Sequence, residues 1–156
     1  MRQQCKPSMK ALMSKPFDAA LYQDDDDAKL LVMEWLNSRG HNILVNPDQY
    51  GIDLIGIDRS DRPCAWEVEV KHNWKGHEFP FDTVHYSVRK RKFVQPDVKT
   101  WFITLNHERT RAVVFSHKHF MEGRLVQKST IYTQDEWFVE IPVRQGIFID
   151  LQKEGF

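Results

Sequence analysis

The chain has 156 residues, of which 41% are hydrophobic and 12% aromatic, and its formal net charge is zero. This composition excludes a disordered protein, and no run of residues is long and apolar enough to span a bilayer. The first residues lack the apolar core of a signal peptide, and two cysteines are too few for a disulfide scaffold. We therefore expect a cytoplasmic protein of one domain, with residues 1–16 loose, a core over 17–115 and a C-terminal extension over 116–156.

The first element that the pattern predicts is a helix. Residues 17–22 suit a short helical turn, and the four acids Asp24–Asp27 suit the start of a helix, whose dipole they complement. An apolar stripe at helical spacing follows, formed by Ala28, Leu31, Val32, Trp35 and Leu36. Gly40 is expected to end this helix, and residues 43–45 are expected to form a short strand.

Two predicted strands carry acids where strands usually carry neutral side chains. The first covers residues 51–57 and contains Asp53, and the second covers residues 66–71. Successive side chains of a strand alternate between its faces, so the second strand has an apolar face and a polar face with Glu67, Glu69 and Lys71. Such alternation is also common on the solvated face of a hairpin, so Glu67 is either an auxiliary acid or only a solvent-exposed surface residue.

The connection between these strands, residues 58–63, is rich in turn residues and favours a hairpin. With a turn centred on Asp61, Asp53 lies opposite Glu69, with Cβ atoms about 4.5–5.5 Å apart. Two carboxylates this close repel each other unless a cation lies between them, and their hard oxygens suit Mg²⁺ or Mn²⁺. Lys71, on the same face, would hold the attacking water or stabilise the developing negative charge.

A second helix is predicted over residues 82–95, where Pro96 ends it. Its bases would grip the phosphates beside the scissile bond: His85, Arg89 and Lys92 on one stripe, with Lys90 and Arg91 beside it. Lys75, just after the second acidic strand, is a further candidate contact. The alternative is a helix whose charges only keep it soluble. Later apolar runs predict strands over residues 101–105, 111–115, 129–133, 137–141 and 147–151.

Charge is distributed unevenly although it sums to zero. Residues 18–69 hold twelve acids and four bases, whereas residues 84–128 hold ten bases and three acids. An acidic half would hold metal, and a basic half would attract a polyanion such as DNA. The alternative is that these charges are scattered over a mixed surface.

Asp53, followed by Glu69-Val70-Lys71 at the end of the next strand, resembles the motif of the PD-(D/E)xK nuclease superfamily, over roughly residues 24–115. The resemblance implies an α/β fold with a mixed central sheet flanked by helices, built on a restriction-endonuclease-like α-β-β-β-α-β core with additional C-terminal strands. It also implies a metal ion, held by Asp53 and Glu69, and phosphodiester hydrolysis. The residue before Asp53 is Ile52 rather than proline, and the pair Pro47-Asp48 lies in the turn before the strand.

Several members of the superfamily use an acid on the first helix as a further metal ligand, and the resemblance gives Asp27 or Glu34 this role. We expect a Mg²⁺- or Mn²⁺-dependent DNA nuclease; the sequence leaves RNA open as a substrate and is compatible with a homodimer. One alternative is a nucleic-acid-binding or assembly protein that keeps the nuclease fold without turnover. Another is an interaction module whose acidic hairpin only resembles a site.

Overall fold

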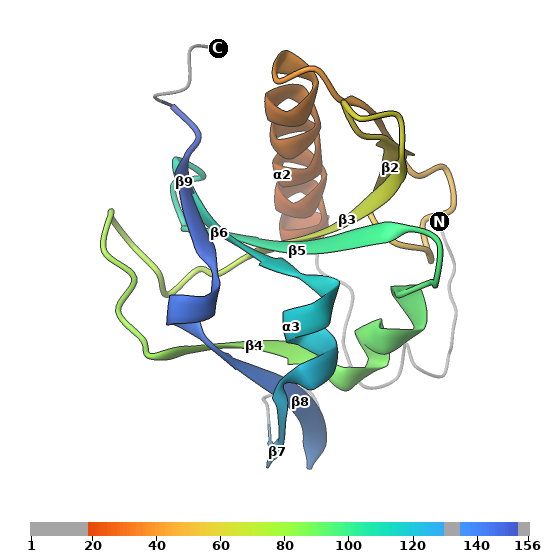
Figure 1. Cartoon of the computed structure of the whole chain (residues 1–156). Helices are drawn as coiled ribbons and strands as arrows, with labels where there is room; N and C mark the ends of the chain where they lie inside the picture. The colour runs from red at the N-terminus through yellow and green to blue at the C-terminus, as the bar shows by residue number, and fades with distance from the viewer. Residues whose placement is uncertain (1–18, 130–134, 153–156) are drawn as a thin grey trace.

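The computed structural model describes residues 19–129 and 135–152, whose elements lie in three layers (Figure 1). In chain order the elements are α2 (Ala19–Ser38), β1 (Asn42–Val45), β2 (Leu54–Ile57), β3 (Pro63–Val70), β4 (Thr83–Ser87), the 3₁₀ helix η1 (Val88–Phe93), β5 (Lys99–Leu105), β6 (Arg111–Ser116), α3 (His117–Glu122), β7 (Arg124–Lys128), β8 (Glu136–Pro142), the 3₁₀ helix η2 (Val143–Gln145) and β9 (Ile147–Asp150). Helix α2 covers one face of a central sheet, and α3 with a smaller sheet covers the other.

The central sheet is mixed. Its six strands run in the order β1-β2-β3-β5-β6-β9, with β3 and β5 parallel and the other neighbours antiparallel. The smaller sheet has the order β4-β8-β7 and is antiparallel. The predicted fold class, a mixed central sheet flanked by helices, is confirmed. Over residues 19–129 and 135–152, no helix has both the length and the apolar character that a membrane crossing requires.

Alternation along the central strands divides the apolar side chains between two cores. In β5, Ile103 and Leu105 face α2, whereas Phe102 faces the smaller sheet. The predicted stripe of α2 packs into the first core, with Val32 fully buried. In the second core Phe102 stacks on Phe120 of α3, with ring centroids 4.3 Å apart. The central sheet therefore has a covering layer on both faces.

Helix α2 starts earlier than predicted. It begins at Ala19, so Asp24–Asp27 lie inside the helix and do not cap it. The residues before the acids include alanine, leucine and glutamine, which are good helix formers and extend the helix through them. Gly40 ends the helix as predicted, with φ of +96°, while the amide of His41 donates to the carbonyl of Leu36.

The predicted helix over residues 82–95 is wrong. Residues 83–87 form strand β4, and η1 follows directly. Val84 and Tyr86 alternate into the second core, which is a period of two rather than 3.6. The partner of β4 is β8, more than fifty residues later in the chain, and it supplies the backbone hydrogen bonds that make the segment a strand. His85, Arg89 and Lys92 consequently do not form one helical stripe.

The C-terminal strands are integrated into both sheets. The predicted strands at 101–105, 111–115, 137–141 and 147–151 are confirmed as β5, β6, β8 and β9. The predicted strand over 129–133 falls almost wholly outside the described residues, and β7 ends at Lys128 just before it. Helix α3 was not predicted. Residues after 116 thus supply one edge of the central sheet and most of the smaller one.

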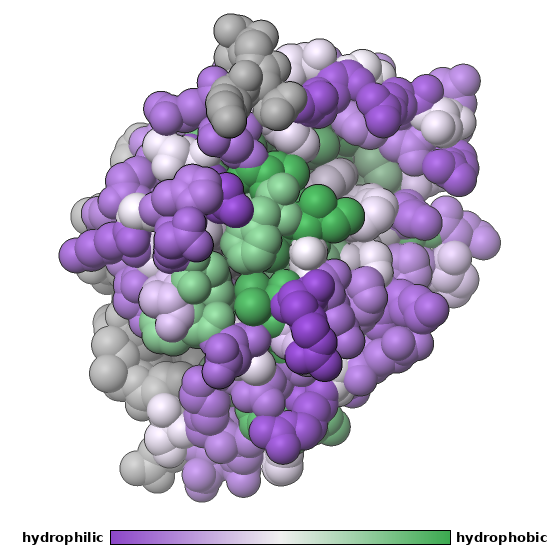
Figure 2. Space-filling view, turned by 60° about the vertical axis from the view of Figure 1, so that its left-hand side comes forward, coloured by the Kyte–Doolittle hydropathy of each residue, from purple (hydrophilic) through white to green (hydrophobic). Residues whose placement is uncertain are grey.

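The edge strand β9 exposes apolar surface. Ile147 is 63% exposed there, and Figure 2, in which this side of the molecule comes forward, shows an apolar strip bordered by hydrophilic side chains. Contiguous exposed apolar surface is typical of protein interaction sites. The homodimer with which the sequence is compatible stays a prediction.

Replacing Gly56 by alanine is expected to destabilise the hairpin of β1 and β2. Gly56 pairs with Ile43, and a Cβ at this position would collide with the carbonyl oxygen of Asn42 and with the backbone of Ile43. Relieving this collision requires a backbone shift, so the free energy of unfolding should fall by about 1–3 kcal/mol, as in overpacked cores. Urea unfolding measures the change. The control is Ile57→Ala, on the exposed next residue, and equal losses in the two variants would contradict the steric explanation.

Candidate active site

The register of β2 and β3 places Asp53 opposite Glu67, and the predicted pairing with Glu69 is wrong. Leu54 pairs with Trp66, so continuing the ladder by one residue brings Asp53 level with Glu67. The turn centres on Ser60 rather than on Asp61, and within it the Asp58 carboxylate accepts hydrogen bonds from the amides of Ser60 and Arg62. The register moves by two residues, which changes the partner and keeps the face.

Asp53 is held from three sides. Its Oδ2 accepts a hydrogen bond from the amide of Val68 at 2.8 Å, and its own amide donates to Oε1 of Glu67 at 3.3 Å. Lys29 of α2 places its ammonium 3.3 Å from Oδ1. The carbonyl of Asp53 also accepts from the amide of Asn46. The carboxylate therefore has a fixed position directly before β2, which begins at Leu54 and not at residue 51 as predicted.

The acids of β3 lie beneath η1. Glu67 is 6% exposed, and Lys90 of η1 hydrogen-bonds to it. The same ammonium lies 3.1 Å from Glu69, whose side chain is 34% exposed. The prediction that Glu67 shares a face with Glu69 is confirmed, but the solvated-face alternative is wrong for Glu67. One cation thus contacts two carboxylates of the same strand.

Burial sets the protonation of this cluster. It raises the pKa of Glu67 to about 7; Lys90 opposes the rise, and the negative charges of Asp53 and Glu69 add to it. Burial also lowers the pKa of Lys90, but the carboxylates of Glu69 and Glu67 outweigh this effect, and the net shift is upward. Lys90 therefore stays charged at neutral pH, while Glu67 gains or loses its proton close to neutral pH.

Without divalent cations, stability is expected to fall as the pH rises from about 5 to about 8. The pKa of Glu67 is raised from 4.5 to about 7 on folding, so the folded state binds a proton that the unfolded state has lost, and its stabilisation disappears as that proton leaves. Urea unfolding at several pH values measures this slope. Glu67→Gln should flatten it, and an unchanged slope in that variant would assign the effect to another group.

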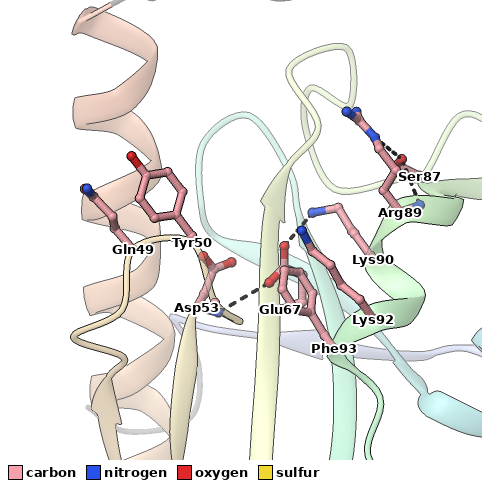
Figure 3. A pocket seen from close by; sticks show the side chains of 10 residues that line it. Gln49, Tyr50, Asp53, Glu67, Ser87, Arg89, Lys90, Lys92 and Phe93 are labelled. Carbon is pink, nitrogen blue, oxygen red and sulfur yellow. Dashed lines mark hydrogen bonds and ion pairs between the residues drawn. The ribbon is translucent and has the colours of Figure 1, made fainter. Parts of the chain in front are cut away.

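The carboxylates open onto a pocket of about 270 Å³. In Figure 3, Asp53 and Glu67 lie between two walls, one from the loop before β2 and one from η1. The pocket is lined by Gln49, Tyr50, Gly51, Asp53, Glu67, Ser87, Arg89, Lys90, Lys92 and Phe93. Acids thus form its floor, and bases form one wall.

The lysine of the sequence motif lies elsewhere. Lys71 follows the end of β3, does not line the pocket, and has its ammonium 4.8 Å from the ring centroid of Phe81. Burial lowers the pKa of Lys71, and the charge of Glu69 opposes this. Lys75 is exposed on the following loop. Lys90, expected to contact phosphate, points inward to the acids.

The other bases that were predicted to contact phosphate lie in different parts of the structure. Arg89 and Lys92 line the pocket, and Arg89 pairs with Glu136 at 2.8 Å. Arg91 of η1 is half-buried and does not line the pocket. His85 lies on β4 with its Nε2 2.9 Å from Glu140, so it belongs to the smaller sheet.

Helix α2 contributes a base to the site. Asp27 and Glu34 are exposed, and Lys29 is the α2 residue that the structure pairs with Asp53. Lys29 and Tyr50 were not predicted as site residues. The position of Lys29, two residues after the acidic run, was the only signal for its role, whereas Tyr50 had none beyond its place before the first acidic residue.

The donor set suits a hard divalent cation. Among the described residues, no three His, Cys, Asp or Glu side chains are grouped closely enough to form a complete metal site. Mg²⁺, however, usually binds proteins through one or two carboxylates and keeps several waters. Asp53 and Glu67 supply two carboxylates at one pocket, and Lys90 shows that the acids of β3 already hold a positive charge. The residues present therefore fit Mg²⁺ or Mn²⁺.

Comparison with known proteins identifies the fold. No protein-family model matches the chain, and no curated protein matches its sequence. Among solved structures it is similar to Hjc, a Holliday junction resolvase from the archaeal hyperthermophile Archaeoglobus fulgidus. The TM-score is 0.51 with 12% sequence identity, over 81% of this chain and 92% of Hjc. The mixed sheet with its flanking helices is thus a restriction-endonuclease-like fold, as the sequence implied.

Proposed function

We propose that this chain is a metal-dependent nuclease that hydrolyses phosphodiester bonds of DNA. The observation that carries the proposal is the position of Asp53, directly before β2, and Glu67, in the neighbouring strand β3, which face one pocket while bases form its wall. The similarity to the fold of a Holliday junction resolvase supports it. A site that binds both a phosphate backbone and a divalent cation needs basic and acidic side chains close together in one pocket.

Each pocket residue has a role in this proposal. Asp53 and Glu67 would hold Mg²⁺ or Mn²⁺, and Glu69, two residues further along β3, would add negative charge beside this pair. When bound, the ion polarises a phosphoryl oxygen and lowers the pKa of a water. Lys90 would stabilise negative charge beside these acids, the role that the sequence motif assigns to Lys71.

The basic wall would position the substrate. Arg89 and Lys92 project from η1 at the pocket and carry charges that suit phosphates on either side of the scissile bond. Arg89 is oriented by Glu136 and by Ser87, whose Oγ accepts from its Nε at 3.2 Å. An oriented guanidinium loses less conformational freedom when it binds a phosphate.

A second candidate is a nucleic-acid-binding or assembly protein with an inactive nuclease fold. Lys29 and Lys90 favour it, because their ammonium groups already contact Asp53, Glu67 and Glu69. Carboxylates paired in this way are compatible with a fold that needs no metal. Such a protein would bind DNA and hydrolyse none with any divalent ion.

A cleavage assay separates the two candidates. The substrates are linear duplex, single-stranded, flap and four-way-junction DNA, with a matched RNA strand, each in Mg²⁺, Mn²⁺ or EDTA. The nuclease proposal expects metal-dependent cutting that Asp53→Asn removes, and a comparison of Lys71→Ala with Lys90→Ala identifies the lysine that acts. DNA binding without cutting would select the inactive fold, and neither binding nor cutting would overturn both.

A further inference from the structure

The loop that forms one wall of the pocket is held rigidly by its own side chains. Asn46 donates from Nδ2 to the carbonyl of Ile52 and accepts at Oδ1 from the amide of Asp48. Asp48 in turn accepts from the amide of Tyr50 at 3.0 Å, and its carbonyl accepts from the amide of Gly51. These hydrogen bonds fix the backbone on both sides of Tyr50, so this side chain is presented from a preorganised support.

Tyr50 is the exposed aromatic residue of the pocket. It is 56% exposed, the second-highest value among the large apolar and aromatic side chains that the described residues expose. Figure 3 shows its ring rising beside Asp53, with Lys92 and Phe93 of η1 on the other side of Glu67. Isolated exposed aromatics are ordinary, but this one stands within a charged pocket over the acids.

The space between these walls, about 270 Å³, suits one nucleotide rather than a duplex. In a paired duplex the faces of the bases are stacked on their neighbours and are closed to an aromatic side chain. An unpaired base offers its face, and stacking on tyrosine is a general way in which proteins bind single strands. The bases of η1 would meanwhile contact the phosphates of the same strand.

We propose that the pocket receives one unpaired nucleotide, whose base stacks on Tyr50 while its phosphate faces Asp53 and Glu67. The inference rests on the proposed nuclease function and narrows its substrate to DNA with a single-stranded segment, such as a flap, an open end or a free strand. An intact duplex would enter the pocket poorly, because a nucleotide must first leave the stack.

Binding of short single strands tests the stacking. Affinity is measured by fluorescence anisotropy in Ca²⁺ for wild type, Tyr50→Leu and Tyr50→Phe. The length of each strand is checked afterwards to show that it was not cut. Tyr50→Leu should weaken binding by roughly 5- to 150-fold, the range for loss of one stacked base, while Tyr50→Phe, which keeps the ring, stays close to wild type. Trp137→Leu, which removes a similarly exposed aromatic from β8, is the matched control and should change nothing.

Strands with one abasic residue locate the contact. At one position the missing base should weaken binding to wild type as much as Tyr50→Leu does, and should have no further effect on that variant. Equal binding by Tyr50→Leu and wild type, or the absence of any such abasic position, would overturn the inference. Efficient cutting of intact duplex by wild type would also overturn it and leave the nuclease function standing, whereas no cutting of any DNA would refute the nuclease itself.

Discussion

Replacing Glu67 by glutamine is expected to lower the rate of DNA cleavage by more than about 100-fold. Loss of a residue that merely supports a metal ligand typically reduces activity or affinity by 10–100-fold, and loss of a ligand should exceed this. Glutamine retains the size of the side chain and removes its charge, so Asp53 would face the cation alone. Single-turnover cleavage in Mg²⁺ and in Mn²⁺ measures the rate.

The controls for this variant separate chemistry from folding. Glu122→Gln, on the exposed surface of α3, should cut at the wild-type rate. Glu67→Gln itself should unfold at a similar or higher urea concentration at neutral pH, since it removes a carboxylate that is 6% exposed. If Glu67→Gln cut normally and Glu69→Gln did not, the metal ligand would be Glu69, despite the observed register.

Replacing Lys90 by methionine is expected to destabilise the metal-free protein by about 3 kcal/mol, the lower end for breaking a buried ion pair. Methionine fills the space of the lysine stem but leaves Glu67 and Glu69 without their shared cation. The lower end applies because Glu69 is partly exposed and Glu67, whose pKa is about 7, gains a proton more readily than an ordinary carboxyl. Urea unfolding in EDTA measures the loss.

Divalent cations should reverse part of this loss. With Lys90 gone, Mg²⁺ or Mn²⁺ would be the remaining neutralising charge, so each should raise the unfolding midpoint of Lys90→Met more than that of wild type. Lys92→Met is the matched control, because Lys92 lines the same pocket without pairing with these acids in the structure. An equal effect of the cations on both variants would show that they bind away from Glu67 and Glu69.

Local pattern was sufficient to place the acids on one face. Alternation along residues 66–71 put Glu67 and Glu69 together, and their apolar neighbours Val68 and Val70 pack toward α2 as expected. Such patterns are reliable because the geometry of a strand allows little else once one face must be buried. The apolar stripe of α2 and the four confirmed later strands follow from the same argument.

The register between β2 and β3 could not be predicted from alternation. A shift of two residues keeps every side chain on its face, so the hydrophobic pattern is equally satisfied with Glu67 or Glu69 opposite Asp53. The choice depends on the turn, where Asp58 binds the amides of Ser60 and Arg62. Many sequences rich in aspartate and serine form turns of several lengths, and composition does not select among them.

The segment over residues 83–93 shows a different difficulty. Its clustered bases favoured a helix, yet Val84 and Tyr86 alternate as in a strand because β8 pairs beside them. That partner is remote in sequence, so no local window contains the reason. As a result Lys90 arrives over the acids of β3 from a 3₁₀ helix, and its role changes from a phosphate contact to an internal ion pair.

The polar face of the acidic strands was readable from residue spacing, because burial of one face imposes a period on any strand or helix, and the class of fold followed from the resemblance of the motif to a nuclease superfamily. The identity of the facing carboxylates, the arrival of Lys29 and Lys90, and the place of Tyr50 at the pocket were decided by packing. The contacts of Glu67 with Asp53 and Lys90, and of Lys29 with Asp53, join residues 14 to 24 positions apart. Their geometry depends on the turn between β2 and β3 and on the pairing of β4 with β8, which are more than fifty residues apart. Long-range contacts of this kind form only when the layers assemble, so the site itself is a property of the tertiary structure.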